Sequence, residues 1–319
     1  MDLLAPLTAF LVAWLVARNL PRWRRLPMDH PNARSLHARP VPRSGGLAIW
    51  AGMIAAAMFL PQGAGAPLLP AALLGAVSFA DDVWGLRVAW RLASHVALVA
   101  GFLWWLGLPA GVGWWALPVL VWMANLYNFM DGADGLAGGM AVVGFSVYGV
   151  AAWDGGQSAL ALLSFSVAAA ATGFLVYNFP PAKLFMGDAG SIPLGFLAAA
   201  VGVLGWREAT WGAWFPLLVF SPFIVDATVT LGKRLLRGEK VWRAHREHYY
   251  QRLVRAGLGH RGTALLEYGL MLACGAAALA LHRFGGDGAA LWALAGGVVG
   301  YGGLMAAAES YVKRRGTPP

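Results

Sequence analysis

Apolar stretches recur along almost the whole chain, and only short polar segments separate them. A helix that crosses a bilayer needs about 20 mainly apolar residues, which is the scale of these stretches. By this criterion we place about eleven spans, near residues 3–20, 46–61, 66–80, 91–108, 112–128, 136–153, 158–178, 191–206, 211–232, 263–282 and 288–310. The pattern therefore predicts an all-α fold, a polytopic bundle of transmembrane helices.

The composition indicates one membrane domain rather than a membrane anchor that carries a soluble domain. Of the 319 residues, 59% are hydrophobic and 12% are charged, whereas soluble domains carry about 25% charged residues. No polar stretch is long enough to fold as a separate soluble unit. We expect residues 1–319 to form a single integral-membrane domain.

The basic residues predict the orientation of this bundle, because membrane proteins concentrate Lys and Arg in cytoplasmic loops. If the N-terminus lies outside, only Arg207 and Arg283 fall on the periplasmic side. We therefore expect a multi-pass protein of the bacterial inner (plasma) membrane, with a periplasmic N-terminus and a cytoplasmic C-terminus. The same rule accounts for the net charge of +9, so binding to nucleic acid is not expected.

Oxygen-bearing side chains gather where predicted spans meet cytoplasmic segments. They form two groups, the adjacent pair Asp81-Asp82 and the set Asn125, Asn128, Asp131 and Asp134. Residues three apart share a helix face, and Mg²⁺ prefers oxygen ligands such as carboxylates. The closing Glu of an EF-hand and the lysine of a P-loop are absent. We expect these groups to hold Mg²⁺ or a phosphate-bound cation, or to accept a proton at the aspartate pair.

A further carboxylate and two basic loops lie on the same predicted side. Asp188 follows Gly187 directly before a predicted span, where it could meet a phosphate-bound cation. The loop from residue 29 to 46 and the longest loop, with residues 243–253, are rich in Arg and His, which suits phosphate. For the longest loop, a metal site at its histidines or a basic segment on the lipid surface are the alternatives.

These features in combination favour phosphoryl transfer between a soluble and a lipid substrate. A transporter of lipid or ions that uses membrane carboxylates is the alternative from another class, although its charges are more often found at mid-membrane. A CDP-alcohol phosphotransferase is a rival within the enzymes. Only its Asp-Gly element, at Asp131-Gly132, is present, and the Ala-Arg and paired aspartates expected after it do not follow.

Five segments together resemble the polyprenyl-phosphate N-acetylhexosamine-1-phosphate transferases. They are Asp29–Gly46, Asp81-Asp82, Asn125–Leu136, Phe185–Ser191 and the His/Arg loop of residues 243–253. The likeness implies a Mg²⁺-dependent phosphoglycosyl transferase, with Mn²⁺ as a substitute metal. Such an enzyme moves a sugar-1-phosphate from a UDP-amino sugar to undecaprenyl phosphate in the bilayer and releases UMP.

The resemblance also implies roles for individual residues. Asp188 would hold Mg²⁺ with help from Asn128, and Asp81 and Asp82 would be catalytic residues that serve the lipid phosphate or its proton. The nucleotide sugar would be bound by Asn125, Asp131, Asp134, Phe185, His245, Arg246 and His248. The lipid phosphate would meet Asn32, Arg34, His37 and Arg43. A homodimer is a further expectation from the resemblance.

The longest loop distinguishes branches of the family. Its His245-Arg246-Glu247-His248 sequence departs from the three-histidine run of the peptidoglycan-precursor branch, which uses UDP-MurNAc-pentapeptide, and from the His-x-His element of enterobacterial GlcNAc transferases. It is more similar to members that initiate O-antigen (lipopolysaccharide) assembly from UDP-GlcNAc, UDP-FucNAc or UDP-QuiNAc. Phospho-MurNAc-pentapeptide transfer in cell-wall synthesis stays the alternative. The sequence leaves direct displacement and a two-step route through a phosphorylated Asp both open.

Overall fold

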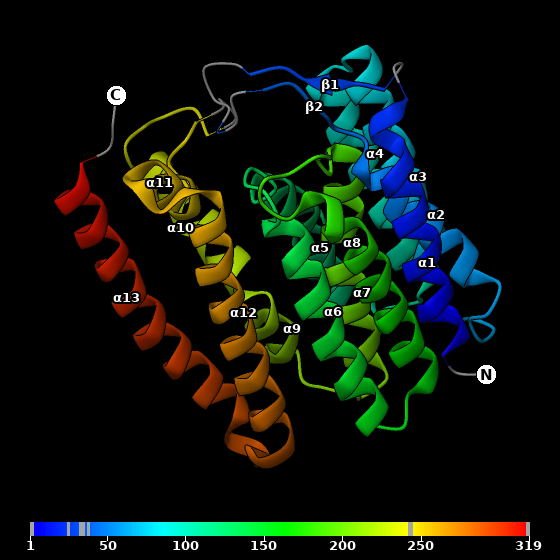
Figure 1. The fold of residues 1–319 in the computed structure, drawn as a ribbon. Coiled ribbons are helices and arrows are strands. Elements are labelled where there is room, and N and C mark those ends of the chain that lie inside the picture. Colours follow the sequence, from blue (N-terminus) through cyan, green and yellow to red (C-terminus); the bar gives the residue numbers. More distant parts are fainter. Residues whose placement is uncertain (1–2, 24–25, 32–35, 37–38, 242–244, 317–319) are drawn as a thin grey trace.

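The computed structural model describes residues 3–23, 26–31, 36, 39–241 and 245–316. Its architecture is a bundle of helices, which confirms the all-α prediction (Figure 1). The helices are α1 (Leu4–Asn19), α2 (Gly45–Ala57), α3 (Leu68–Trp84), α4 (Val88–Trp105), α5 (Ala110–Phe129), α6 (Leu136–Asp154), α7 (Ser158–Asn178), α8 (Asp188–Arg207), α9 (Trp214–Val219), α10 (Ser221–Leu236), α11 (Tyr249–Leu253), α12 (Gly259–Phe284) and α13 (Ala289–Arg315). Short helical turns cover Leu20–Arg22, Val254–Leu258 and Gly286–Gly288.

Every predicted span overlaps a helix of the structure. Within the described residues, 7 helical segments are both long and apolar enough to cross a membrane, which confirms the polytopic class. They are Leu4–Arg22, Val88–Trp105, Leu136–Asp154, Ser158–Asn178, Asp188–Arg207, Tyr249–Phe284 and Gly286–Arg315. The larger number of crossings stays a prediction.

The span predicted near residues 211–232 is interrupted in the structure. α9 ends at Val219 and α10 starts at Ser221. Pro222 has no backbone N–H, so it cannot continue the helical ladder to the carbonyl of Leu218. The hydroxyl of Ser221 donates to that carbonyl instead, at 2.6 Å. α10 therefore starts as a separate helix, and it carries side chains that support the candidate site.

A small antiparallel ribbon, absent from the sequence-based prediction, joins the first loop to the site. Its strands are β1 (Met28–Asp29) and β2 (Val41–Pro42), with Met28 opposite Pro42. The chain after β2 then pairs with the segment before α8. Its main-chain hydrogen bonds are Phe185 N–H to Pro42 O, Gly45 N–H to Phe185 O and Gly46 N–H to Met186 O, each 2.8 Å long.

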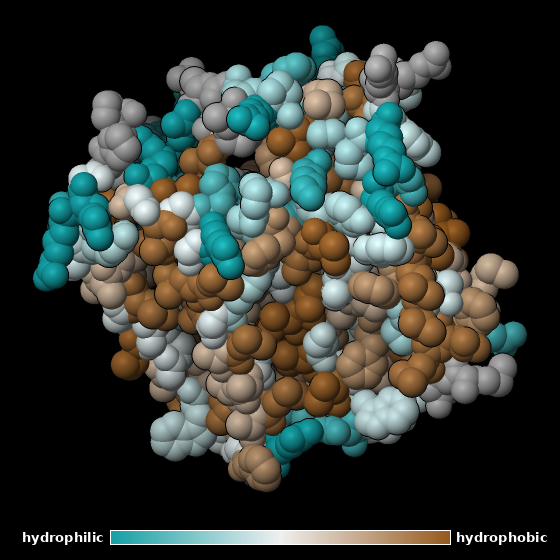
Figure 2. Space-filling view, in the orientation of Figure 1, coloured by the Kyte–Doolittle hydropathy of each residue, from teal (hydrophilic) through white to brown (hydrophobic). Residues whose placement is uncertain are grey.

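The core lies among α5, α6, α7 and α8. The outer surface of the bundle around this core is also hydrophobic. α8 is buried along most of its length, from Ala189 to Gly202. α13 stands at the edge of the bundle and remains largely exposed, as expected of a helix that faces lipid (Figure 1). Apolar side chains cover the middle of the molecule, and hydrophilic ones gather at the end with the β ribbon and α11 (Figure 2). The termini lie at opposite ends of the bundle.

Candidate functional site

A cavity of about 700 Å³ opens at the end of the bundle that carries the β ribbon and α11. Cavities of this size accommodate small ligands and cofactors. Its wall comes from distant parts of the chain: the β ribbon, the start of α4, the segments after α5 and before α8, and the loop before α11.

Most residues assigned to the site from sequence line this one cavity. They are Arg43, Asn125, Asn128, Asp131, Asp134, Phe185, Asp188, His245 and His248. Three others, Asp81, Asp82 and Arg246, are described by the structure but lie off the wall. Asn32, Arg34 and His37 lie outside the described residues. The fold therefore unites the acidic segments with the histidine loop.

A turn at Gly187 presents Asp188 to the cavity. Gly187 has φ of +73° and ψ of 167°, a backbone conformation that residues with a Cβ rarely adopt. A Cβ there would lie 2.4 Å from the carbonyl oxygen of Arg43. α8 begins at the next residue, so the Asp188 carboxylate lies in the first turn of that helix, where negative charge is favourable.

Asn128, at the end of α5, orients this carboxylate. Its side-chain amide donates a hydrogen bond to Asp188. Its Oδ1 accepts a hydrogen bond from Ser191 Oγ at 2.8 Å, one turn into α8. Asn128 therefore fixes the Asp188 carboxylate relative to the first turn of α8.

Two arginines of the cavity wall cover the adjacent aspartates of α3. Arg43 pairs with Asp82. Arg91 pairs with Asp81 Oδ2 at 2.8 Å and with Asp188 Oδ2 at 3.3 Å. The Asp82 side chain is only 1% exposed, and its Oδ2 has no hydrogen-bond partner within the described part of the chain. Asp81 and Asp82 therefore contact the arginines that line the cavity and do not line it themselves.

Asn178, at the end of α7, ties two wall segments together. Its Oδ1 accepts a hydrogen bond from Gly135 N–H at 3.0 Å, and its Nδ2 donates to Leu184 O at 2.9 Å. The first bond holds the loop of residues 130–135, and the second holds the segment before α8. This buried amide thus fixes the spacing between Asp131 and Asp188.

His260, at the start of α12, fixes the far side of the same loop. Its Nε2 donates to Leu36 O at 3.0 Å, and its Nδ1 lies 3.1 Å from the backbone nitrogen and 3.2 Å from the Oδ1 of Asp134. Asp134 Oδ2 accepts from Ala182 N–H at 2.9 Å. Asp134 is therefore engaged in holding three segments of the chain in place at the cavity wall.

Several carboxylates crowd one part of the cavity wall. The buried setting of Asp131, followed by the charges of Asp188 and Asp82, raises the pKa of Asp131 well above its usual range. Mutual repulsion of this kind is relieved by a bound cation. The wall is therefore chemically suited to hold positive charge beside Asp131 and Asp188.

The donor set fits Mg²⁺ in one specific way. Among the described residues, no three Asp, Glu, His or Cys side chains lie close enough to hold a metal by themselves. Mg²⁺ is commonly held by one or two carboxylates, with water and substrate phosphate completing its shell. Asp188 lies on the wall and is oriented by Asn128, so these residues fit a cation that arrives with phosphate.

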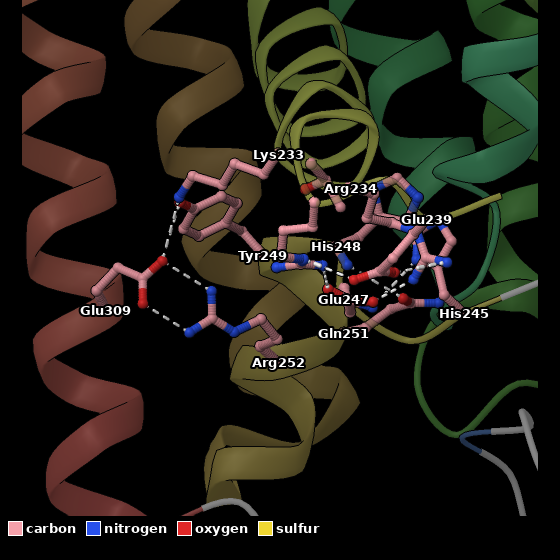
Figure 3. A network of polar contacts seen from close by, with 12 residues as sticks. Lys233, Arg234, Glu239, His245, Glu247, His248, Tyr249, Gln251, Arg252 and Glu309 are labelled. Carbon is pink, nitrogen blue, oxygen red and sulfur yellow. Dashed lines mark hydrogen bonds and ion pairs between the residues drawn. The ribbon is translucent and has the colours of Figure 1, made fainter. Parts of the chain in front are cut away.

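The arginines near the end of α10 pair with glutamates and do not line the cavity. Glu247 pairs with Arg234 and with Arg237, and Arg234 also meets Glu239 at 3.0 Å (Figure 3). These ion pairs fold the loop before α11 against the end of α10. Arg246, which the sequence analysis places at the nucleotide sugar, lies off the cavity wall in this arrangement.

His245 and His248 form the opposite wall of the cavity. Their ring centroids are 4.9 Å apart. Burial, followed by the charges of His248 and Arg234, lowers the pKa of His245 to about 4. His245 is therefore neutral at physiological pH in the substrate-free protein.

Several wall residues receive no role from the sequence: Arg91, His95, Asn178, Gln251 and His260. For Arg91 the sequence offers only a positive charge near a span end. His95 lies four residues after Arg91, and this spacing places both on one face of α4, which is a signal that could have been read. Asn178 and His260 act through backbone atoms of distant segments, which no local pattern reveals.

Residues 65–205 match the family described as Glycosyl transferase family 4. The "Probable undecaprenyl-phosphate N-acetylglucosaminyl 1-phosphate transferase" of Bacillus subtilis (strain 168) is 32% identical over 265 residues, covering 76% of this chain and 73% of the relative. The "Decaprenyl-phosphate N-acetylglucosaminephosphotransferase" of Mycobacterium leprae (strain TN) is 30% identical over 289 residues, covering 75% and 73%. A "Phospho-N-acetylmuramoyl-pentapeptide-transferase" of Levilactobacillus brevis is 44% identical over 130 residues, covering 39% and 40%.

The family match includes the segments that hold Asp81, Asp131 and Asp188, and the two longer relatives extend the similarity over about three quarters of the chain. These matches agree with the family expected from the sequence. This protein therefore belongs to glycosyl transferase family 4.

Proposed function

We propose that this protein transfers N-acetylglucosamine-1-phosphate from UDP-N-acetylglucosamine to undecaprenyl phosphate and releases UMP. The family and the names of its relatives support an enzyme that moves a phosphosugar onto a polyprenyl phosphate. One observation carries the proposal for this chain. Carboxylates, arginines and histidines line the same cavity, which lies at one end of an apolar bundle. There a nucleotide sugar could enter from water while the prenyl chain stays in lipid.

The choice of sugar follows the longer matches. The two relatives described above that match about three quarters of this chain carry N-acetylglucosamine in their names, whereas a Streptomyces coelicolor relative that matches 94% of it is named only a putative glycosyltransferase. UDP-FucNAc and UDP-QuiNAc are the next donors to test, and the product would start a cell-surface glycan such as O-antigen. Phospho-MurNAc-pentapeptide transfer is the second candidate because of the shorter match at 44% identity.

The proposed reaction is a direct displacement. An oxygen of the lipid phosphate forms a bond to the sugar-linked phosphorus, and the bond from that phosphorus to the UMP oxygen breaks. A phosphate monoester has a second pKa of about 6, so the attacking group is already largely ionised at pH 7. A strong base is therefore unnecessary.

The burial of Asp82 supports this route over one through a phosphorylated aspartate. A nucleophile must reach the phosphorus, whereas Asp82 is covered by Arg43 and its side chain is 1% exposed. We assign Asp81 and Asp82 to holding Arg91 and Arg43, whose guanidinium groups face the cavity. Arginine forms strong paired hydrogen bonds with phosphate, so these groups would bind the two phosphate-bearing substrates.

Asp188, oriented by Asn128, would hold Mg²⁺, with Mn²⁺ as a substitute. When bound, the ion would neutralise charge on the pyrophosphate. His245 and His248 would contact the same pyrophosphate from the opposite wall. Asn125, Asp131, Asp134 and Phe185 would line the part of the cavity that takes the nucleotide sugar.

The test is UMP release by the purified protein in liposomes with undecaprenyl phosphate and Mg²⁺. We expect release with UDP-GlcNAc, and a panel of UDP-FucNAc, UDP-QuiNAc and UDP-MurNAc-pentapeptide ranks the donors. Asp188→Asn should lower kcat about a hundredfold or more, since it removes the carboxylate that would hold the ion. Folded protein that releases no UMP from any of these donors would favour a transporter instead.

A matched control is Asp154→Asn. Asp154 lies at the opposite end of the bundle, where it pairs with Arg283. Its loss should leave UMP release near the wild-type rate. Full activity of Asp188→Asn under the same conditions would contradict the metal assignment.

A further inference from the structure

Asp226 is a buried carboxylate behind the candidate site, and the proposed function gives it no role. It lies within α10 and is 6% exposed. Four groups contact its carboxylate oxygens. Oδ1 accepts hydrogen bonds from Tyr249 N–H at 3.0 Å and Thr230 Oγ1 at 3.1 Å and lies 3.2 Å from His248 Nδ1, and Oδ2 accepts a hydrogen bond from Tyr250 N–H at 3.0 Å. Three of the four belong to the segment that presents the histidine to the cavity.

The backbone contacts fix the start of α11. This helix has 5 residues, which is too short to be stable by itself, and its first N–H groups lack partners within the helix. The carboxylate of Asp226 accepts the N–H groups of Tyr249 and Tyr250 and adds favourable negative charge at this helix end. α11 is thereby attached to α10 at a defined place.

The same carboxylate controls His248. A carboxylate can only accept, so the 3.2 Å contact is a hydrogen bond only when His248 carries a proton on Nδ1. The ring plane is fixed between Phe129, with centroids 6.3 Å apart, and Tyr250, at 5.8 Å. His248 lines the cavity, and its second nitrogen, Nε2, is the one left for a ligand.

We infer that Asp226 is a positioning residue that holds the Nδ1 proton of His248, so that Nε2 can serve the phosphates of the nucleotide sugar. A proton on Nε2 gives an imidazolium that can donate to a phosphate oxygen, and Asp226 balances its charge from behind. This inference rests on the proposed function for the identity of the ligand. The pairing of Asp226 with His248 and the cap on α11 do not depend on it.

The variant Asp226→Asn separates positioning from simple capping. The asparagine oxygen can still accept a backbone N–H of α11, but its NH₂ group can only donate. The amide also carries no charge, so it cannot balance the positive charge of a protonated His248 as the carboxylate does. We expect kcat/KM for UDP-GlcNAc to fall about tenfold to a hundredfold, the usual cost of losing an outer partner that orients a functional histidine.

The double variant with His248→Gln is the decisive comparison. If Asp226 acts through His248, Asp226→Asn should cost little further activity once the histidine is gone, because residues that act as a unit are not additive. Independent losses that multiply in the double variant would overturn the inference in favour of a structural cap. Thr230→Val is the matched control, because it removes one hydrogen bond to the same oxygen and leaves the histidine contact intact.

A measurement on the wild-type protein keeps the inference testable if Asp226→Asn does not fold. In protein labelled with ¹⁵N-histidine, the His248 resonances, assigned by their absence in His248→Gln, should show a protonated Nδ1. A neutral His248 with its proton on Nε2 would overturn the inference. This reading needs no turnover, so it is distinct from failure of wild-type protein to release UMP, which would overturn the proposed function alone.

Discussion

Arg43 and Arg91 bring positive charge to a cavity wall that would otherwise be strongly acidic. Each is already paired with a carboxylate in the substrate-free protein, Arg43 with Asp82 and Arg91 with Asp81 and Asp188. Removing one partner of a buried ion pair leaves an uncompensated charge, which is costly. Asp82 is the more deeply buried of the adjacent aspartates, and loss of Arg43 would leave it without an ion-pair partner among the described residues.

At the scale of single residues, His245 offers a prediction about pH. Its pKa is lowered to about 4, first by burial and then by the charges of His248 and Arg234. The shift is downward, so the ring stays neutral as the pH falls through 6.5 and gains its proton only near pH 4. In ¹⁵N-histidine NMR of the substrate-free protein, the His245 resonance should not titrate between pH 5.5 and 8.

The matching control is His30, an exposed histidine of the first loop. His30→Gln identifies its resonance, and His245→Gln identifies the other. A His245 resonance that titrates with a midpoint near 6.5 would contradict the buried, cation-flanked setting described for it.

The sequence is informative about residues whose chemistry is local. The spacing of Asn125, Asn128, Asp131 and Asp134 predicts side chains that lie close together, and all four line the cavity. It cannot reveal that Arg91 lies between Asp81 and Asp188, because that contact depends on how α3, α4 and α8 pack. Nor can it show that Arg246 lies off the cavity wall while His245 and His248 line it.

At the scale of elements, α13 is attached to the site by one polar network. Glu309 accepts from both terminal nitrogens of Arg252, at 2.9 and 2.8 Å, and from the hydroxyl of Tyr249 at 3.1 Å (Figure 3). Lys233 of α10 reaches the same carboxylate at 3.4 Å. A single side chain thus connects α13 with both α10 and α11.

Glu309→Gln should weaken this connection without changing the size of the side chain. The groups are partly exposed, so we expect the interaction that keeps α11 in place to lose about 1 kcal/mol of stabilisation. That corresponds to a fall in kcat/KM of about two- to fivefold, measured by UMP release. Arg314→Gln changes an exposed charge near the end of the same helix and serves as the control. Equal effects of the two variants would show that the network does not support the site.

The elements themselves were largely predictable, and their interruptions were not. Apolar runs mark each of the longer helices because a lipid-facing helix needs them, whereas the short α11 lies in a polar loop. The break between α9 and α10 was missed because Pro222 lies within an apolar run, where hydropathy alone cannot register a lost hydrogen bond. The β ribbon was missed because two-residue strands depend on pairing between distant segments.

At the scale of the whole molecule, the two ends of the bundle differ in the extent of their hydrophilic surface. The end with the β ribbon and α11 carries the cavity and the larger hydrophilic surface, and a smaller hydrophilic group lies at the opposite end (Figure 2). Excess Lys and Arg favour the cytoplasmic side of a membrane. We propose that the cavity faces the cytoplasm, where nucleotide sugars are soluble.

Single-cysteine labelling tests this orientation. In a Cys274→Ser background, which removes the one native cysteine, Lys240→Cys places a thiol near the cavity end and Glu208→Cys places one at the opposite end. A maleimide that cannot cross membranes should label the Glu208 variant in intact spheroplasts and the Lys240 variant only after permeabilisation. The background protein alone should stay unlabelled, and the reverse pattern would place the cavity outside.

The segment after β2 and the segment before α8 meet at a joint made by backbone hydrogen bonds. This joint limits which substitutions the chain tolerates there. Its three hydrogen bonds use only backbone atoms of Pro42, Gly45, Gly46, Phe185 and Met186. Side-chain substitutions therefore leave those bonds intact, provided that the two chains still approach closely. That approach excludes any bulk at Gly46, where a Cβ would lie 2.4 Å from the nitrogen of Gly190. Evolution is thus freer to change the polar side chains around this joint than to add one methyl group within it.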